Sequence, residues 1–152
     1  MKTTIRHKIF ETNSSSSHSL SVAHRGNLNI PSPDKDGVLH INPKTTEFGW
    51  GLEFYNDFDT KAAYIMVDIK QRYPHDNVVL EEFLEFLKEV TGAKHIDYSE
   101  IDFEEEDEGY MYNSYVDHQS AGTGIRLLED KEEVKRFLFN YKSELEISND
   151  NM

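Results

Sequence analysis

The chain contains no cysteine, and this absence excludes several kinds of chemistry. There is no disulfide framework, no thiolate nucleophile and no cysteine-based zinc or iron–sulfur site. No segment approaches the roughly 18 consecutive apolar residues that a membrane helix needs, and the basic N-terminus is followed by no apolar stretch of the kind found in signal peptides. We therefore expect a cytoplasmic protein that has no membrane partner.

Basic residues are also scarce, because 16 lysines and arginines stand against 29 aspartates and glutamates, for a net charge of -13. Such a surface repels phosphate backbones, so direct binding to nucleic acid is not expected. The charge is uneven: residues 1–30 hold four basic residues and a single acid. An anionic small ligand is therefore expected near the N-terminal segment. No Walker loop or dinucleotide fingerprint occurs, which excludes a standard ATPase or Rossmann enzyme and leaves the cofactor unknown.

The 152 residues have the usual length of one domain, and 37% of them are hydrophobic, enough for one core. We expect a single domain over residues 1–152, with an acidic loop at about 99–109 and a frayed C-terminal tail at about 147–152. Strands come first and helices mostly later, which favours an α+β fold over an α/β fold. The expected architecture is a small antiparallel or mixed sheet of short strands packed by about three helices.

Short strands are predicted at residues 4–10, 19–23, 38–41 and 109–117 from their β-branched and aromatic content. A polar turn is expected between the first two strands. The dense set of glycine, proline, asparagine and aspartate between residues 26 and 37 predicts an exposed loop.

Three helices are predicted from hydrophobic spacing and end signals. The first begins after an N-cap at Asp59 and stops near Tyr73. The second covers about residues 80–90 and ends at Gly92 in a left-handed cap. The third begins with a capping box formed by Asp130 and Glu133. Its expected core face consists of Val134, Phe137, Leu138, Tyr141 and Leu145.

The most unusual segment is a run of nine polar residues: Glu11, Thr12, Asn13, Ser14, Ser15, Ser16, Ser17, His18 and Ser19. Small hydroxylated side chains let consecutive backbone N–H groups gather around one oxygen-rich ligand, and each hydroxyl can donate as well as accept. With Arg6, Lys8 and His18 nearby, this run is a candidate cradle for phosphate or carboxylate. The alternative is a solvated serine-rich connection between two strands.

Residues 10–20, Phe-Glu-Thr-Asn-Ser-Ser-Ser-Ser-His-Ser-Leu, resemble the N-terminal signature of a family of small uncharacterised proteins of bacteriophages and bacteria. The similarity extends to residues 48–50, 61–64 and 116–120. The resemblance implies a phage or bacterial origin, and so a bacterial host cell as the location, but it implies no reaction. It also suggests that the serine run and residues 117–120 belong to one polar site.

Asp117, His118, Gln119 and Ser120 follow a predicted strand and precede a glycine-rich stretch, so we expect them at a strand end, where functional side chains often project. Neighbouring residues of an extended chain point to opposite faces, and we expect His118 to be the one that points inward. The alternative is an Asx-type turn whose side chains bond their own backbone.

Three enzymatic hypotheses can be ranked, and whether the protein is an enzyme is left open. A serine hydrolase lacks support because no G-x-S-x-G nucleophile elbow occurs. A metal site from His18, His118 and either Glu11 or Asp117 has a plausible ligand set, but no ligand spacing supports it. The most coherent hypothesis is acid–base catalysis by His18 or His118, with Asp117, on a phosphate-bearing ligand.

Two further features remain open. Trp50, between two glycines, could stack on a base or sugar ring, or could belong to the core. The histidines outside the proposed site have no evident partner in the sequence; these are His7, His24, His40, His75 and His95.

The acidic surplus supports an alternative that involves no catalysis. Carboxylates of residues 100–108 and of the helix at 80–90 could take the place of nucleic-acid phosphates and occupy the groove of a basic host protein. Such acidic runs also occur simply as solvated faces that keep a protein in solution. Mimicry of this kind leaves the serine and histidine segment unexplained, so it is the second hypothesis.

Overall fold

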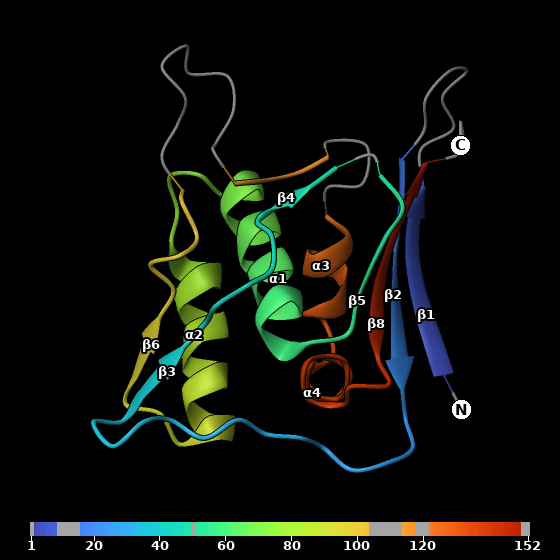
Figure 1. The fold of residues 1–152 in the computed structure, drawn as a ribbon. Coiled ribbons are helices and arrows are strands. Elements are labelled where there is room, and N and C mark those ends of the chain that lie inside the picture. The colour runs from blue at the N-terminus through green and yellow to red at the C-terminus, as the bar shows by residue number, and fades with distance from the viewer. Residues whose placement is uncertain (1, 9–15, 50, 104–113, 118–121, 150–152) are drawn as a thin grey trace.

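The computed structural model describes residues 2–8, 16–49, 51–103, 114–117 and 122–149, with the backbone alone for residues 2–8, 16 and 149. In this part the chain has an α+β fold, as the sequence predicts, with four helices and eight strands (Figure 1). The elements in chain order are β1 (Lys2–Lys8), β2 (Ser16–Ala23), β3 (Val38–His40), β4 (Glu47–Phe48), β5 (Glu53–Tyr55), α1 (Phe58–Arg72), α2 (Val78–Thr91), β6 (His95–Asp97), β7 (Tyr115–Val116), α3 (Thr123–Leu127), α4 (Lys131–Phe139) and β8 (Glu144–Asn149).

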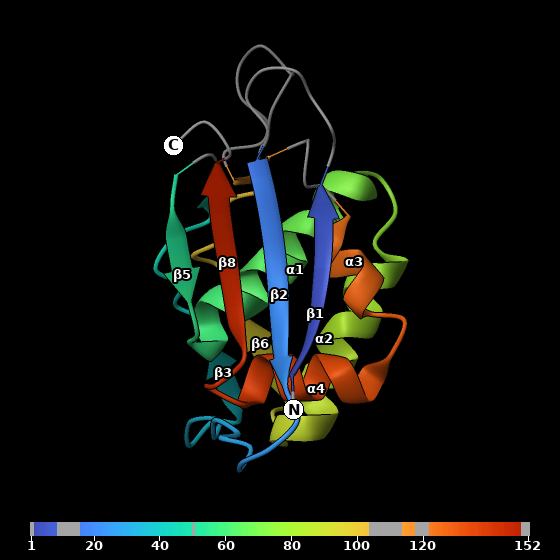
Figure 2. The same ribbon diagram turned by 90° about the vertical axis from the view of Figure 1, so that its right-hand side faces the viewer.

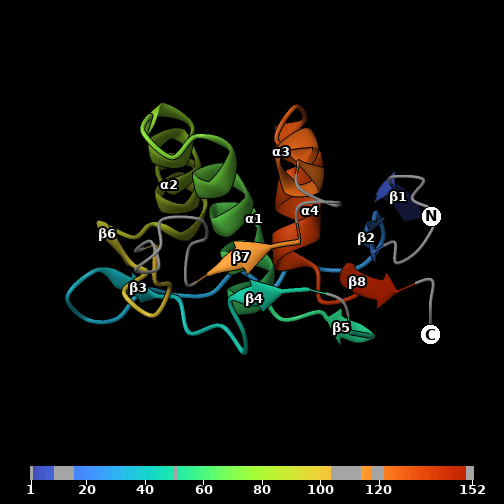
Figure 3. The same cartoon turned by 90° about the horizontal axis from the view of Figure 1, so that it is seen from above.

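The largest sheet has four strands in the order β1-β2-β8-β5, and every neighbouring pair is antiparallel. Figure 2 shows this sheet face-on, with α1, α3 and α4 behind it. Two parallel pairs, β3 with β6 and β4 with β7, form separate small sheets. Seen from above, both pairs lie along the same side of α1 and α2 (Figure 3). Of the described helices, none is long and apolar enough to cross a membrane.

Helix α1 is the centre of the core, because every residue from Thr60 to Ile69 is buried. The helix is capped by Asp57, whose carboxylate accepts a hydrogen bond from the Thr60 N–H at 2.9 Å. The predicted N-cap Asp59 is therefore wrong by two residues, and it lies instead in the first turn. The C-terminal end is confirmed, since Tyr73 is the C-cap.

Local sequence signals predict α2 and the start of α4 correctly. Gly92 ends α2 with a φ of 79° and donates its N–H to the Lys88 carbonyl. Asp130 caps α4 by accepting from two backbone N–H groups, but Glu133 does not complete the capping box, because it bonds His24 at 2.7 Å. Helix α4 ends at Phe139, so the prediction is wrong for Tyr141, which is exposed, and for Leu145, which lies in β8.

Two segments expected to be irregular are strands. Strand β2 begins at Ser16, so the predicted turn is wrong for Ser16, Ser17 and His18. Strand β8 runs to Asn149, so the tail expected to fray from residue 147 is wrong for residues 147–149. Both strands lie in the interior of the sheet, where neighbours on each side satisfy their backbone groups. These tertiary partners outweigh the local preference of serine for turns.

Several expectations fall wholly or partly outside the described residues. These are residues 104–109 of the acidic loop, residues 109–113 of the fourth predicted strand, and residues 150–152 of the tail. Of the predicted strand at 109–117, the described part contains β7 at Tyr115–Val116. Helix α3 and strands β4, β5, β6 and β8 are elements that the sequence did not predict.

Two histidines outside the predicted site have carboxylate partners that the sequence did not reveal. His40 is bonded through Nδ1 to Asp97 and through Nε2 to Asp34, both at 2.8 Å. These carboxylate contacts, Asp34 first, raise the pKa of His40. His24 is bonded to Glu133 of α4. Both contacts join segments of the fold, and neither lies in the site predicted from the sequence.

Candidate functional site

His18 of β2 is the sequence-predicted site residue with the clearest structural role. It alternates with Leu20 and Val22, which face the helices, and all three side chains are 0% exposed. Its Nδ1 lies 2.9 Å from the Tyr64 hydroxyl, and its Nε2 lies 3.3 Å from the Gly49 carbonyl oxygen. The imidazole thus links the sheet to α1 and to the chain that follows β4.

These hydrogen bonds have a definite direction in the neutral ring. A carbonyl oxygen can only accept, so Nε2 of His18 carries the proton and Nδ1 accepts from the Tyr64 hydroxyl. The Thr123 side chain is also hydrogen-bonded to Tyr64, and this bond lowers the pKa of Tyr64, as donation to the phenolic oxygen does. Hydrogen bonds therefore run from Thr123 through Tyr64 and His18 to Gly49. We call these four residues the His18 network.

Tyr64 is held as a neutral hydroxyl at the centre of this network. Its full burial raises the pKa well above the usual value of 10.0, and the nearby carboxylates of Asp68 and Asp117 raise it further. Its ring packs edge-on against Phe48, with 4.9 Å between the centroids. Tyr64 therefore keeps the proton that it donates to His18, and it also fixes the residue before Gly49.

Asp68, one helical turn after Tyr64, fastens the start of α3 to α1. Its carboxylate accepts hydrogen bonds from the backbone N–H groups of Gly122, Gly124 and Ile125, at 2.7, 2.9 and 3.1 Å. A Cβ atom at residue 124 would lie 3.2 Å from Asp68 Oδ2, so glycine allows this close approach. Asp68 is buried as well, and its charge is stabilised by these N–H donors.

Lys61 completes a polar stripe on α1, because Lys61, Tyr64 and Asp68 are spaced i, i+3 and i+7. Its buried ammonium donates to the carbonyl oxygens of Asn140 at 3.2 Å and Ser143 at 3.1 Å. Burial lowers the pKa of Lys61 from 10.5 to about 7. The stripe thus binds three separate segments to one helix: the turn before β8, strand β2 and the start of α3.

The short β4–β7 pair brings Asp117 close to the C-terminal half of α1. Its N–H donates to the Phe48 carbonyl at 2.7 Å, and its side chain is 3% exposed. The Gln71 amide of α1 holds the preceding residue, Val116, with bonds of 3.0 and 2.8 Å to its N–H and carbonyl. Asp117 is therefore fixed beside Phe48 at the end of β4. The next residue, Gly49, is the one whose carbonyl is bonded to His18.

The described flanks of three predicted polar segments consequently lie together. Ser17 and His18 belong to the C-terminal part of the serine run, Gly49 precedes Trp50, and Asp117 precedes His118. On the other side of β2, the strand register pairs Arg6 with Ser19 and Lys8 with Ser17. Ser17 and Ser19 alternate with His18, so they lie on the opposite side of the strand from its ring.

The remaining predicted site residues lie outside the described residues: Glu11, Thr12, Asn13, Ser14, Ser15, Trp50, His118, Gln119 and Ser120. Their ligand-binding and catalytic roles stay predictions. So does an acid–base role for His18, whose ring is fully buried in the His18 network.

Tyr64, Asp68 and Thr123 were missed by reasoning from the sequence. One available signal was the tyrosine in Lys-Ala-Ala-Tyr at residues 61–64, a stretch that takes part in the family resemblance. Another was the presence of Lys61 and Asp68 in a helix whose neighbouring residues are mostly apolar. Such a helix is buried on all sides, and its charged residues then need specific partners.

Within the described residues, no group of three or more histidine, aspartate or glutamate side chains could hold a metal ion. Comparisons of the chain with protein-family models, with curated proteins and with solved structures found no match. The resemblance to small phage and bacterial proteins therefore stays a prediction.

Proposed function

We propose that the protein binds a small phosphate-bearing ligand at the end of the molecule where Ser17, Gly49 and Asp117 lie. Two hydrogen bonds carry this proposal, one from His18 to the Gly49 carbonyl and one from the Asp117 N–H to the Phe48 carbonyl. Together they connect the flanks of three segments rich in hydroxyl, imidazole and amide groups. Convergence of such groups from several elements is a common property of ligand sites.

The charge of the ligand is inferred from strand β1. Its register sets Arg6 and Lys8 opposite Ser19 and Ser17, at the end of the sheet next to the serine run. Arg6 and Lys8 are two of the four basic residues among the first thirty positions, which contain a single acidic residue. An anion is therefore favoured at this end of the sheet.

His18 is a positioning residue in this proposal. Its ring is fully buried and bonded on both nitrogens, so it fixes Gly49 relative to β2. In this proposal the protein is a small accessory protein of a phage-infected or bacterial cell, and ligand binding requires no acid–base chemistry at the site.

Thermal unfolding in the presence of inorganic phosphate, pyrophosphate or a nucleoside triphosphate tests the proposal. A ligand at about a hundred times its Kd is expected to add roughly 2.7 kcal/mol to the free energy of unfolding, and so to raise Tm. Sodium chloride at equal ionic strength should give no comparable increase.

Matched variants on one strand make this test specific. Arg6→Gln and Lys8→Gln are expected to weaken the stabilisation, whereas Lys2→Gln, at the opposite end of β1 beside Ala23, is expected to retain it. If no phosphate compound raises Tm, or if all three variants respond alike, the proposal is wrong.

A further inference from the structure

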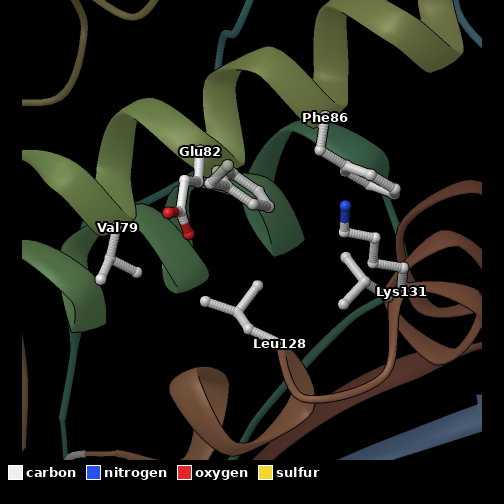
Figure 4. A pocket seen from close by; sticks show the side chains of 7 residues that line it. Val79, Glu82, Phe86, Leu128 and Lys131 are labelled. Atoms are coloured by element: carbon white, nitrogen blue, oxygen red, sulfur yellow. The ribbon is translucent and has the colours of Figure 1, made fainter.

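A groove of about 90 Å³ lies between α2 and the start of α4, together with Leu128 at the end of α3. Figure 4 shows Val79, Glu82 and Phe86 projecting from α2 towards Leu128, which follows α3, and Lys131, the first residue of α4. Phe83 and Val134 complete the lining, and both are almost fully buried. The groove therefore has an apolar floor and a charged side chain on each side.

The α2 residues in this lining form one helical face. Val79, Glu82, Phe83 and Phe86 are spaced i, i+3, i+4 and i+7. Pockets for small molecules usually enclose about 300–1,000 Å³, so a groove of about 90 Å³ is too small for such a ligand. It is suited to a single apolar side chain, as in complexes where an amphipathic helix inserts anchor residues into a groove.

The charges around the groove indicate what such a partner must carry. Helix α2 has four exposed glutamates, Glu81, Glu82, Glu85 and Glu89, against the single lysine Lys88, which is bonded to Glu85 at 3.1 Å. Among the described residues, neither Glu82 nor Lys131 forms an ion pair. The α2 side of the groove is therefore strongly acidic, and this favours a basic partner.

We propose that this groove is the docking site for a basic amphipathic helix of a partner protein. One apolar side chain of that helix occupies the space between Phe86 and Leu128. Lysine or arginine residues on the same helix pair with Glu82 and the neighbouring glutamates of α2, and an acidic residue on its other side meets Lys131. None of the residues that line the groove belongs to the His18 network, and the proposal does not depend on the phosphate ligand proposed above.

A short fluorescein-labelled helical peptide, with leucine on one face and lysine on the other, serves as the probe. Fluorescence polarisation is expected to detect binding to the wild-type protein. Binding should weaken at least about tenfold when the central leucine of the peptide is replaced by serine, and it should be lost when its lysines become glutamates.

Substitutions in the protein locate the contact. Phe86→Ser and Leu128→Ser are expected to weaken binding of the peptide about tenfold. The control is Leu52→Ser, because Leu52 is a 53% exposed apolar residue elsewhere and its loss should leave binding unchanged. NMR chemical-shift changes in the wild-type protein, which need no substitution, should centre on Val79, Phe86, Leu128 and Lys131.

Three results would overturn the proposal. One is that the wild-type protein does not bind the leucine–lysine peptide. Another is evidence of unspecific attraction: Phe86→Ser and Leu128→Ser bind the peptide as tightly as Leu52→Ser, and the shift changes in the wild-type protein lie outside the groove. The third is self-association that Phe86→Ser abolishes, which would assign the groove to a second copy of this chain.

Discussion

Loss of the alkaline pH dependence of stability is the expected result of Lys61→Met. Burial lowers the pKa of the Lys61 ammonium to about 7 in the folded protein, while the unfolded chain keeps the usual value of 10.5. Between these values the unfolded state binds more protons than the folded state, so the stability of the wild-type protein rises with pH. The slope from this one group approaches about 1.4 kcal/mol per pH unit, and its total is at most about 5 kcal/mol.

Urea unfolding at a series of pH values between 7 and 10.5 measures this effect. The comparison variant is Lys70→Met, because Lys70 lies on the same helix but is only partly buried and is bonded to Asn77. Lys70→Met should keep the wild-type slope, whereas Lys61→Met should flatten it. Equal slopes in Lys61→Met and the wild-type protein would show that the ammonium is not held in the core.

Replacement of Asp68 by asparagine is expected to lower the free energy of unfolding by about 3 kcal/mol, because hydrogen bonds to a buried charged group are strong and their donors are costly to leave unpaired. The carboxylate accepts from three backbone N–H groups at the start of α3. The asparagine side chain has the same shape, but its NH₂ group cannot accept, so at least one of these N–H groups loses its partner.

Asp59→Asn is the matched control for this substitution. Asp59 lies in the first turn of the same helix, and burial together with the nearby Asp57 raises its pKa, so its charge is not favoured by its surroundings. Denaturant unfolding should therefore show a loss for Asp68→Asn and little change or a small gain for Asp59→Asn. A change below about 0.5 kcal/mol for Asp68→Asn, the usual range of surface substitutions, would contradict the role given to this carboxylate.

The elements predicted best are those whose signals are local. The apolar spacing of α2 with Gly92 after it, and Asp130 before α4, depend on residues within a few positions of one another. Strand β8 was missed, although Leu145 and Ile147 alternate with Glu144 and Glu146 in the two-residue period of a strand. The expected extension of the preceding helix to Leu145 obscured that pattern.

Strand β2 shows the limit of local reasoning more clearly. Ser16, Ser17 and His18 have the composition of a turn, and nothing within the segment indicates two neighbouring strands. Its position between β1 and β8 depends on residues 144–149, at the other end of the described chain. A polar strand of this kind is stabilised by long-range pairing that composition does not reveal.

The candidate site was predicted in part. The sequence singled out His18 and Asp117, and the structure connects both to Tyr64, one by a hydrogen bond and the other by its charge. It did not indicate Tyr64 or Asp68, because each acquires its role from partners about fifty residues away. The stripe on α1 is thus a property of the fold, although every residue in it is visible in the sequence.

NMR titration of the ¹⁵N-labelled protein with pyrophosphate tests most directly whether the segments joined by the His18 network form one binding site. The amide signals of Ser17, Gly49 and Asp117 are expected to shift together with a single Kd, while those of α2 and β3 stay in place. Shifts confined to other parts of the chain, or different Kd values for these three amides, would contradict a common site.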